Sequence, residues 1–251
     1  MDKLSNEIPG SSEKPHNRIA IVANFTAEPI EESLKLWLDQ LGFSSGIRFA
    51  PYNQVFQELL DPSSTLSMNR NGLNVVLLRL EDWWRESRNT QARKQTLGTI
   101  QSDLEGLVGE FLAALRTASS RSSVPYLVTL CPSSQQVKSD PSLAEFLDLQ
   151  EKRIEEDLKD SNGIYVVSSA QFLSDYPVSN YDDTRADQLG HVPYTLELFA
   201  ALGTMVVRRF YGIRSPGYKV IILDCDNTLW RGVCGEDGPE GVQVDSPFRA
   251  L

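Results

Sequence analysis

The stretch Leu73-Asn-Val-Val-Leu-Leu-Arg-Leu-Glu-Asp82 decides the predicted fold. Its residues are largely aliphatic or β-branched as far as Arg79, which is typical of a strand buried on both faces of a parallel sheet. The charged residues Arg79, Glu81 and Asp82 follow at its carboxyl end, the edge at which open α/β sheets place ligands. We therefore expect a parallel sheet with a polar site where this strand ends.

Similar apolar segments lie on both sides of this stretch and alternate with helical patterns. Strands are predicted at residues 18–24, 46–51, 124–131 and 163–168. Helices are predicted at residues 31–41, 52–60, 91–118, 142–158 and 193–209, with a polar loop at 177–190. This alternation predicts a three-layer α/β/α sandwich with a mainly parallel sheet, SGNH/flavodoxin-like in type, over residues 17–212.

A second acidic stretch, Lys219-Val-Ile-Ile-Leu-Asp-Cys-Asp-Asn-Thr-Leu-Trp230, follows a linker predicted at residues 213–217. Its apolar residues, up to Leu223, predict another buried strand that runs into a turn with carboxylates at Asp224 and Asp226. On composition alone, an ordinary Asx-rich turn explains the pattern equally well, because Asp and Asn favour turns. Residues 218–251 are expected to form a separate unit.

The overall composition excludes several classes of protein. The 251 residues carry a net charge of −10, which argues against non-specific binding to nucleic acid or to an anionic membrane. The three cysteines form no C-x-x-C pair, so we expect no disulfide scaffold and a reducing, cytoplasmic compartment. No stretch is apolar enough to span a membrane, and residues 1–16 are expected to be a disordered leader.

The turn at Asp224-Cys-Asp-Asn-Thr228 resembles the Asp-x-Asp-x-Thr motif of the haloacid dehalogenase (HAD) superfamily, which follows a hydrophobic strand. With its continuation Leu229-Trp-Arg-Gly-Val-Cys-Gly-Glu-Asp-Gly238, it is similar to the FkbH-like proteins (subfamily IIIC type) of polyketide and mixed peptide–polyketide biosynthesis. Further stretches similar to that subfamily lie at residues 24–26, 49–54, 78–83 and 190–194. The resemblance therefore covers almost the whole chain after residue 16.

The resemblance implies roles for the acidic turn. Asp224 would be the nucleophile and a Mg²⁺ ligand, Asp226 would be the general acid and base and also reach the metal, and Thr228 would cap the loop. Such proteins are associated with dephosphorylating 1,3-bisphosphoglycerate and loading a glyceryl unit onto an acyl carrier protein. Cys225 and Cys234 are the candidates for carrying the acyl group, with packing roles as the alternative.

Two further expectations concern the second unit and the partners. The later HAD motifs find no match before Leu251, so we expect a truncated HAD-like Rossmannoid domain, inactive as this chain alone. The implied partners are an acyl carrier protein or adjoining synthase modules, and a phosphorylated three-carbon acyl donor.

Candidate site residues of the first unit all fall at the predicted carboxyl edge of the sheet. They are Asn24, Thr26, Asn53, Arg79, Glu81, Asp82, Asp187 and His191. The arrangement resembles the SGNH hydrolases, but no Gly-Asp-Ser follows the first strand, and the Asp187–His191 spacing is one residue longer than usual. The alternative function is therefore a non-catalytic α/β domain that docks a carrier protein or synthase.

Overall fold

A computed structural model describes residues 17–43, 45–84, 97–215, 220 and 222–246. The predicted leader at 1–16, the start of the helical tract at 91–96 and the linker residues 216–217 lie outside the described residues. The chain forms two compact units, Met1–Ile213 and Arg214–Leu251, and each is described by itself.

The first unit contains a five-stranded sheet in the order β2-β1-β3-β4-β5, and every neighbouring pair is parallel. Its strands are β1 (Asn17–Ala23), β2 (Ser45–Phe49), β3 (Gly72–Leu78), β4 (Tyr126–Leu130) and β5 (Ile164–Val167). All seven residues of the central strand β3 are buried, which confirms the prediction of a strand covered on both faces.

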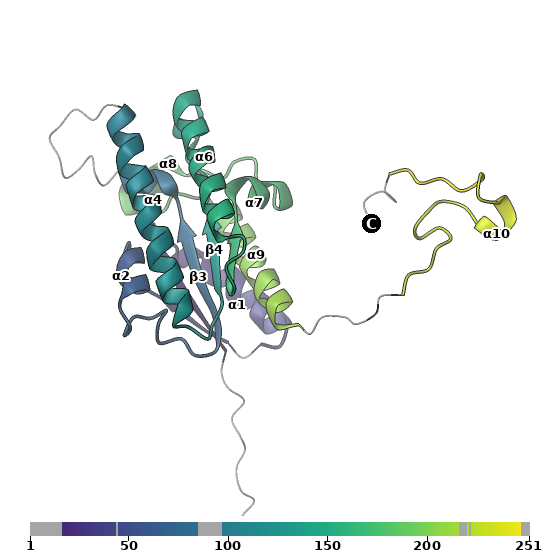
Figure 1. Ribbon diagram of the computed structural model, residues 1–251, viewed down its shortest axis with the longest axis horizontal. Helices are drawn as coiled ribbons and strands as arrows, with labels where there is room; N and C mark the ends of the chain where they lie inside the picture. The colour runs from purple at the N-terminus through teal and green to yellow at the C-terminus, as the bar shows by residue number, and fades with distance from the viewer. Residues whose placement is uncertain (1–16, 44, 85–96, 216–219, 221, 247–251) are drawn as a thin grey trace, which may run out of the picture. The chain divides into compact units, whose positions relative to one another are not determined.

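Helices cover both faces of this sheet, so the predicted three-layer α/β/α fold is confirmed (Figure 1). Helices α2 (Val55–Leu60), α4 (Leu97–Ser120) and α6 (Pro141–Leu158) pack on one face. Helices α1 (Glu31–Gln40), α7 (Ser169–Asp175) and α9 (Leu196–Arg214) pack on the other. The 3₁₀ helix η1 (Glu28–Ile30) and the short helices α5 (Gln135–Lys138) and α8 (Thr184–Gly190) complete the unit.

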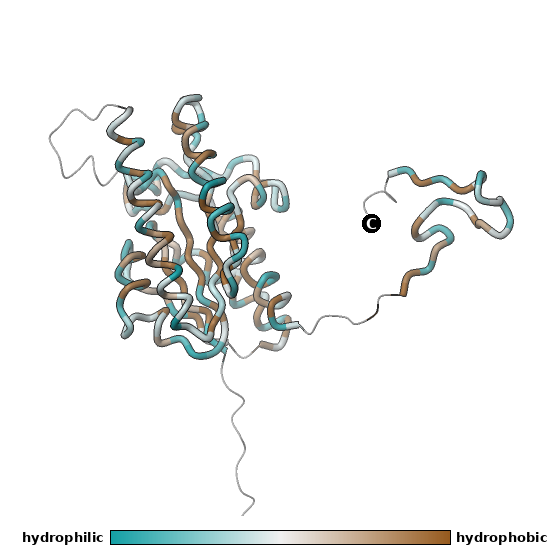
Figure 2. The backbone as a smooth tube through the Cα atoms, viewed as in Figure 1, coloured by the Kyte–Doolittle hydropathy of each residue, from teal (hydrophilic) through white to brown (hydrophobic). Residues whose placement is uncertain are grey.

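The strands divide the core into two clusters because successive side chains point to opposite faces. In β1, Ala20 and Val22 belong to the cluster under α2, α4 and α6, whereas Ile19 and Ile21 belong to the cluster under α1 and α9. Figure 2 shows the apolar strands between helices in which apolar and polar residues alternate along the chain. The core therefore lies in two layers, one on each side of the sheet.

The prediction of a polar loop at residues 177–190 is wrong for its second half, which forms helix α8. Asp183 caps the start of this helix, because its carboxylate accepts a hydrogen bond from the Ala186 N–H at 2.9 Å. Three acidic or small polar residues at its start obscured the helical pattern, since the same residues also favour turns. Helix α9 likewise begins at Leu196, three residues after the predicted start.

The described residues of the strand predicted before Asp224 are not assigned as a strand. Val220, Ile222 and Leu223 have no strand assignment, and 72%, 90% and 52% of their surfaces are exposed. Apolar strands of this kind are stable when neighbouring strands satisfy their main-chain groups and cover their faces. The described part of this unit contains the short helix α10 (Cys234–Asp237) and isolated bridges, and no strand pairs with residues 222–223.

None of the helices among the described residues combines the length and the apolar character that a membrane crossing requires.

Candidate functional site

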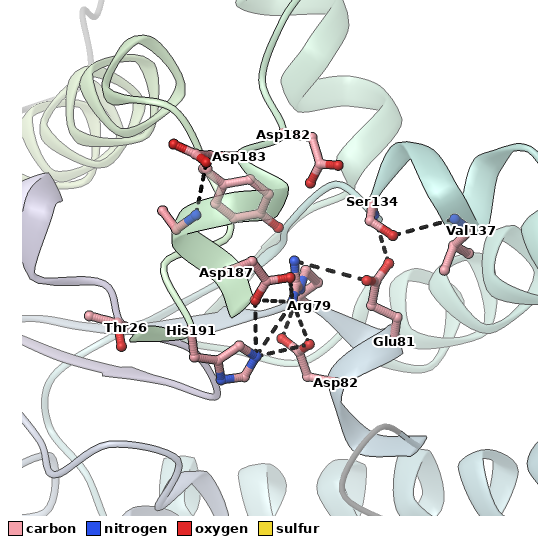
Figure 3. A network of polar contacts seen from close by, with 12 residues as sticks. Thr26, Arg79, Glu81, Asp82, Ser134, Val137, Asp182, Asp183, Asp187 and His191 are labelled. Atoms are coloured by element: carbon pink, nitrogen blue, oxygen red, sulfur yellow. Dashed lines mark hydrogen bonds and ion pairs between the residues drawn. The ribbon is translucent and has the colours of Figure 1, made fainter. Parts of the chain in front are cut away.

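The predicted site residues of the first unit gather at the carboxyl edge of the sheet, as the parallel topology requires. Asn24 and Thr26 follow β1, and Arg79 and Asp82 follow β3. Asp187 lies in helix α8 and His191 directly after it, next to Arg79 and Asp82 (Figure 3). Residues from distant parts of the sequence thus meet around one guanidinium group.

Arg79 is completely buried and organises the site. Its Nε and Nη2 donate to the two carboxylate oxygens of Asp82 at 2.8 and 2.7 Å, in the paired geometry that favours arginine. Nη2 also donates to both oxygens of Asp187, at 3.1 and 3.0 Å (Figure 3). One cation therefore joins the end of β3 to helix α8.

The Asn24 side chain fixes the main chain of Arg79. Its Nδ2 donates to the Arg79 carbonyl and its Oδ1 accepts from the Arg79 N–H, both at 2.9 Å. Asn24 is 1% exposed, so its amide is used in holding β1 and β3 together at their ends. The structure therefore gives Asn24 a positioning contact at the end of β1.

Burial and neighbouring charges shift the pKa values of Arg79 and Asp82 in opposite directions. Burial disfavours the charged form of Arg79, but the hydrogen bond and charge of Asp82 outweigh it and raise the arginine pKa. Burial likewise opposes ionisation of Asp82, yet hydrogen bonds from His191 and Arg79 lower its pKa overall. Arg79 and Asp82 are therefore a charged pair inside the protein.

Glu81 extends the cluster on the side away from His191. Its Oε2 accepts a hydrogen bond from the Ser134 N–H at 2.7 Å, and its Oε1 lies 3.9 Å from Arg79 Nη1. Burial raises the Glu81 pKa, although Arg79 and the Ser134 N–H partly offset this. A cavity of about 240 Å³ beside Glu81 is also lined by Asp140, Asp182 and Asp187. A phosphate in this cavity would face these acidic side chains, so the cavity is poorly suited to an anionic ligand.

His191 ends helix α8 in a left-handed conformation, with φ of 51°. Its Nε2 lies 3.2 Å from Asp82 Oδ1 and 3.7 Å from Asp187 Oδ1. The ionised Asp82 only accepts hydrogen bonds, so we place the ring hydrogen on Nε2. The other ring nitrogen, Nδ1, contacts the Tyr52 hydroxyl and is then free to accept its hydrogen.

Thr26 and Asn53 lie nearby, and both make hydrogen bonds to main-chain carbonyls. The Thr26 hydroxyl donates to the Gly190 carbonyl at 2.7 Å, and its N–H donates to the His191 carbonyl at 2.9 Å. Asn53 has φ of 57°, and its N–H donates to the Ala23 carbonyl at 3.2 Å. The structure thus uses the Thr26 hydroxyl to clamp the end of α8 to the loop after β1.

Tyr52 is the site residue that the sequence did not reveal. It lies in the loop between β2 and α2, one residue before the left-handed Asn53. The loop follows a parallel strand, which places it at the site edge, but many polar and aromatic residues share that property. The partner at His191 lies 139 residues away, and no local pattern indicates it.

The acidic turn of the second unit forms a compact loop with two differently held carboxylates. Asp224 Oδ1 accepts from the Cys225 N–H at 3.0 Å, and Thr228 Oγ1 donates to Asp224 Oδ2 at 3.4 Å. Asp226 Oδ1 accepts from Trp230 Nε1 at 3.1 Å and from the Cys234 N–H at 3.0 Å. Asn227, directly after Asp226, has φ of 56°, a backbone conformation that Asn tolerates better than most residues.

The donor chemistry of this loop fits Mg²⁺, which prefers oxygen ligands and often uses one or two carboxylates, with water and substrate phosphate completing the octahedron. Asp224 is exposed, and each of its oxygens accepts one hydrogen bond within the loop, so lone pairs remain for a cation. Within the part of the chain that the structure describes, no three His, Cys, Asp or Glu side chains form a metal site on their own.

The three cysteines differ in their accessibility. Cys131 is buried, and burial raises its thiol pKa, which disfavours the reactive thiolate. Cys225 and Cys234 are exposed in the acidic loop. The predicted acyl carriers are therefore accessible, whereas Cys131 is a core residue.

No family model matches the chain, and no curated protein matches it by sequence. Among solved structures, it is similar to the N-terminal part of the protein BF1531 from Bacteroides fragilis, which contains a phosphatase domain and was crystallised with Mg. The TM-score is 0.68 at 16% identity, over 92% of this chain and 61% of that one. A salicylyl-acyltransferase, SsfX3, of a tetracycline biosynthetic pathway matches with a TM-score of 0.46 at 12% identity, over 82% and 57% of the two chains.

The chain thus spans less than two thirds of the length of each of these structures. The similarity to the BF1531 fragment shows a shared fold.

Proposed function

We propose that this chain is part of an FkbH-like loading enzyme of polyketide or mixed peptide–polyketide biosynthesis, with phosphoryl transfer at the Asp224–Thr228 loop. The observation that carries the proposal is the unequal environment of the two carboxylates. Thr228 and the Cys225 N–H hold Asp224, whereas an indole N–H and the Cys234 N–H hold Asp226. Two carboxylates in different environments are suited to the two roles of nucleophile and acid–base group.

The chain's residues would divide the chemistry as follows. An oxygen of Asp224 attacks phosphorus to give an aspartyl phosphate, while Asp226 gives its proton to the leaving oxygen and then takes one from the attacking water. Asp224 and the Asp226 main-chain carbonyl would hold Mg²⁺, which supplies positive charge that offsets the charge on the phosphoryl oxygens. The fold shared with a Mg-complexed phosphatase-containing fragment supports this proposal.

The proposal implies two partners, a phosphorylated three-carbon acyl donor and an acyl carrier protein. Cys225 and Cys234 are the thiols that would accept the acyl group, and their exposure supports that role. Because Cys234 donates its N–H to Asp226, acyl and phosphoryl chemistry would be served by one loop.

The test replaces Asp224 by asparagine in the enzyme that carries this loop. We expect Mg²⁺-dependent phosphate release to fall at least about 1,000-fold, because the amide is a poor nucleophile. The matched control is Asp245→Asn, which changes an exposed carboxylate of the same unit that pairs with Arg231 at 3.8 Å. A fully active Asp224→Asn enzyme would exclude the proposed nucleophile.

A second candidate function, docking of the carrier by the first unit, is favoured by an exposed groove between α1 and α9. The groove has a volume of about 280 Å³ and is lined by Trp37, Leu41, Thr204, Val207, Arg208 and Tyr211. Trp, Tyr and Arg are the side chains that most often dominate binding at protein interfaces. An acidic carrier with an apolar helix face would suit this lining.

We expect Trp37→Ala to weaken binding of the cognate carrier by about tenfold or more, measured by calorimetric titration. Leu36→Ala is the matched control, because Leu36 is its exposed neighbour on α1 and does not line the groove. Equal weakening by both variants, or the absence of binding by the unmodified chain, would rule out docking in this groove.

A further inference from the structure

Tyr52 and His191 form a pair that the proposed phosphoryl transfer does not use. The hydroxyl of Tyr52 contacts His191 Nδ1, and the two rings meet edge to face with centroids 5.6 Å apart. Tyr52 is 51% exposed, so a molecule arriving from solvent can approach it. The pair therefore combines a nucleophilic oxygen on Tyr52 with a base on His191, at a position that a substrate can reach from solvent.

The other side of the imidazole is fixed by buried charge. One oxygen of Asp82 lies 3.2 Å from His191 Nε2. The two oxygens of Asp82 also accept hydrogen bonds from Nε and Nη2 of Arg79. Hydroxyl, imidazole and carboxylate thus lie in one line of hydrogen bonds, which is the requirement for activating a hydroxyl by a neighbouring base (Figure 3 shows the His191, Asp82 and Arg79 part of this line). The carboxylate stabilises the imidazolium that forms when the base takes a proton.

Backbone conformation points to the same pair. Asn53, His191 and Asn227 are the non-glycine residues with positive φ among the described residues, and two of the three hold this site. Such conformations are unfavourable and persist where surrounding contacts enforce them, often at functional sites. Here the Ala23 carbonyl binds the Asn53 N–H, and the Thr26 N–H binds the His191 carbonyl.

The ion cluster joins two elements of the fold, and Tyr52 adds a hydroxyl at its exposed side. Arg79, Asp82 and Asp187 join β3 to α8 inside the protein, where less than a tenth of each residue is exposed. Tyr52 is half exposed, and its hydroxyl contacts the histidine ring at the edge of the cluster. Its hydroxyl provides a nucleophilic oxygen next to the His191–Asp82 pair.

We propose that the first unit carries a second reactive site, at which Tyr52 accepts an acyl group from an acyl thioester. The Tyr52 oxygen forms a bond to the carbonyl carbon while His191 Nδ1 takes the phenolic proton. The tetrahedral intermediate then re-forms its C=O bond and expels the thiolate with the C–S electron pair, and the imidazolium protonates that thiolate. The products are a tyrosyl ester and a free thiol, with no net oxidation or reduction.

The ester formed on Tyr52 is an aryl ester, which retains enough reactivity to pass the acyl group to a second hydroxyl or thiol. In that step the phenolate leaves and regains the proton that His191 has taken from the acceptor. This activity goes beyond the proposed phosphoryl transfer and uses none of the residues of the Asp224 loop.

The experiment treats the whole chain with the acetyl thioester of N-acetylcysteamine and measures acetylation of the Tyr52 peptide by mass spectrometry. Peptides containing Cys225 and Cys234 are quantified separately, because exposed thiols exchange with thioesters. We expect acetyl-Tyr52 in the unmodified protein and its absence in Tyr52→Phe. We expect His191→Gln to slow acetylation about 100-fold or more, through loss of the base.

Tyr165→Phe is the matched control, because Tyr165 is 45% exposed on β5 and far from the site in the sheet order. Acetylation of Tyr52 should be unchanged in this variant, and thermal unfolding should confirm that His191→Gln is folded. Acetylation of Tyr52 and Tyr165 at equal rates, an undiminished rate in folded His191→Gln, or no acetyl-Tyr52 would each overturn the proposal. The acetyl readout is independent of phosphate release, so failure of one proposal is distinguishable from failure of the other.

Discussion

Replacement of Arg79 by methionine is expected to lower the free energy of unfolding by about 3–5 kcal/mol at neutral pH. Methionine fills a similar volume but leaves Asp82 and Asp187 without the guanidinium that offsets their charges. Both carboxyl groups lie in surroundings where an uncompensated charge is costly. Unfolding in urea, followed by tryptophan fluorescence, measures the change.

Arg116→Met is the matched control for this prediction. Arg116 pairs with Asp157 at 3.1 Å, but both side chains are 40% or more exposed. Exposed ion pairs contribute about 0–1 kcal/mol, so this variant should unfold almost as the unmodified protein does. Similar stabilities for the two variants would show that the Arg79 cluster contributes no more than a surface pair.

The second large effect is expected for Glu151→Gln and depends on pH. Burial raises the Glu151 pKa to about 7 from its ordinary 4.5, although Ser169 donates its N–H and hydroxyl to Glu151 Oε2 and partly offsets this. The folded protein therefore holds this proton at pH values where the unfolded chain has lost it. The resulting stabilisation is greatest below the unfolded pKa and is lost as pH rises toward the folded pKa.

Glutamine cannot ionise and retains an oxygen that accepts the two Ser169 hydrogen bonds. The variant should match the unmodified protein near about pH 4.5 and become more stable above about pH 7, by up to about 3 kcal/mol. Urea unfolding at both pH values tests this, with Glu145→Gln as the exposed control on the same helix. A stability difference that does not change with pH would show that Glu151 ionises normally in the fold.

The layered fold was predictable from the sequence because a parallel sheet covered on both faces requires continuous apolar strands. The run ending at Leu78 met this requirement, and the structure confirms it. The same reasoning failed for Val220–Leu223, where the apolar run was present but no neighbouring strand pairs with its described residues. An apolar run indicates that a segment favours burial within a sheet. A strand forms only where neighbouring strands pair with the segment and cover it.

The candidate site was predictable to the same extent. Arg79, Asp187 and His191 were expected at one edge, because the carboxyl ends of parallel strands share that edge. The contacts between these residues were not predictable, because they depend on the position of helix α8, and the sequence pattern there predicted a loop. Tyr52 was not predictable for the same reason, because tertiary packing brings it to His191.

The contact between Arg79 and Asp187 spans 108 positions in the chain, and this separation has a consequence for the order of assembly. During synthesis, the guanidinium emerges long before helix α8 exists, and the loop between them must close before the contact forms. The imidazole of His191 therefore reaches its partners only when nearly the entire first unit has been made. Incomplete or locally opened chains lack the aligned base, so reactivity is reserved for molecules that have finished folding.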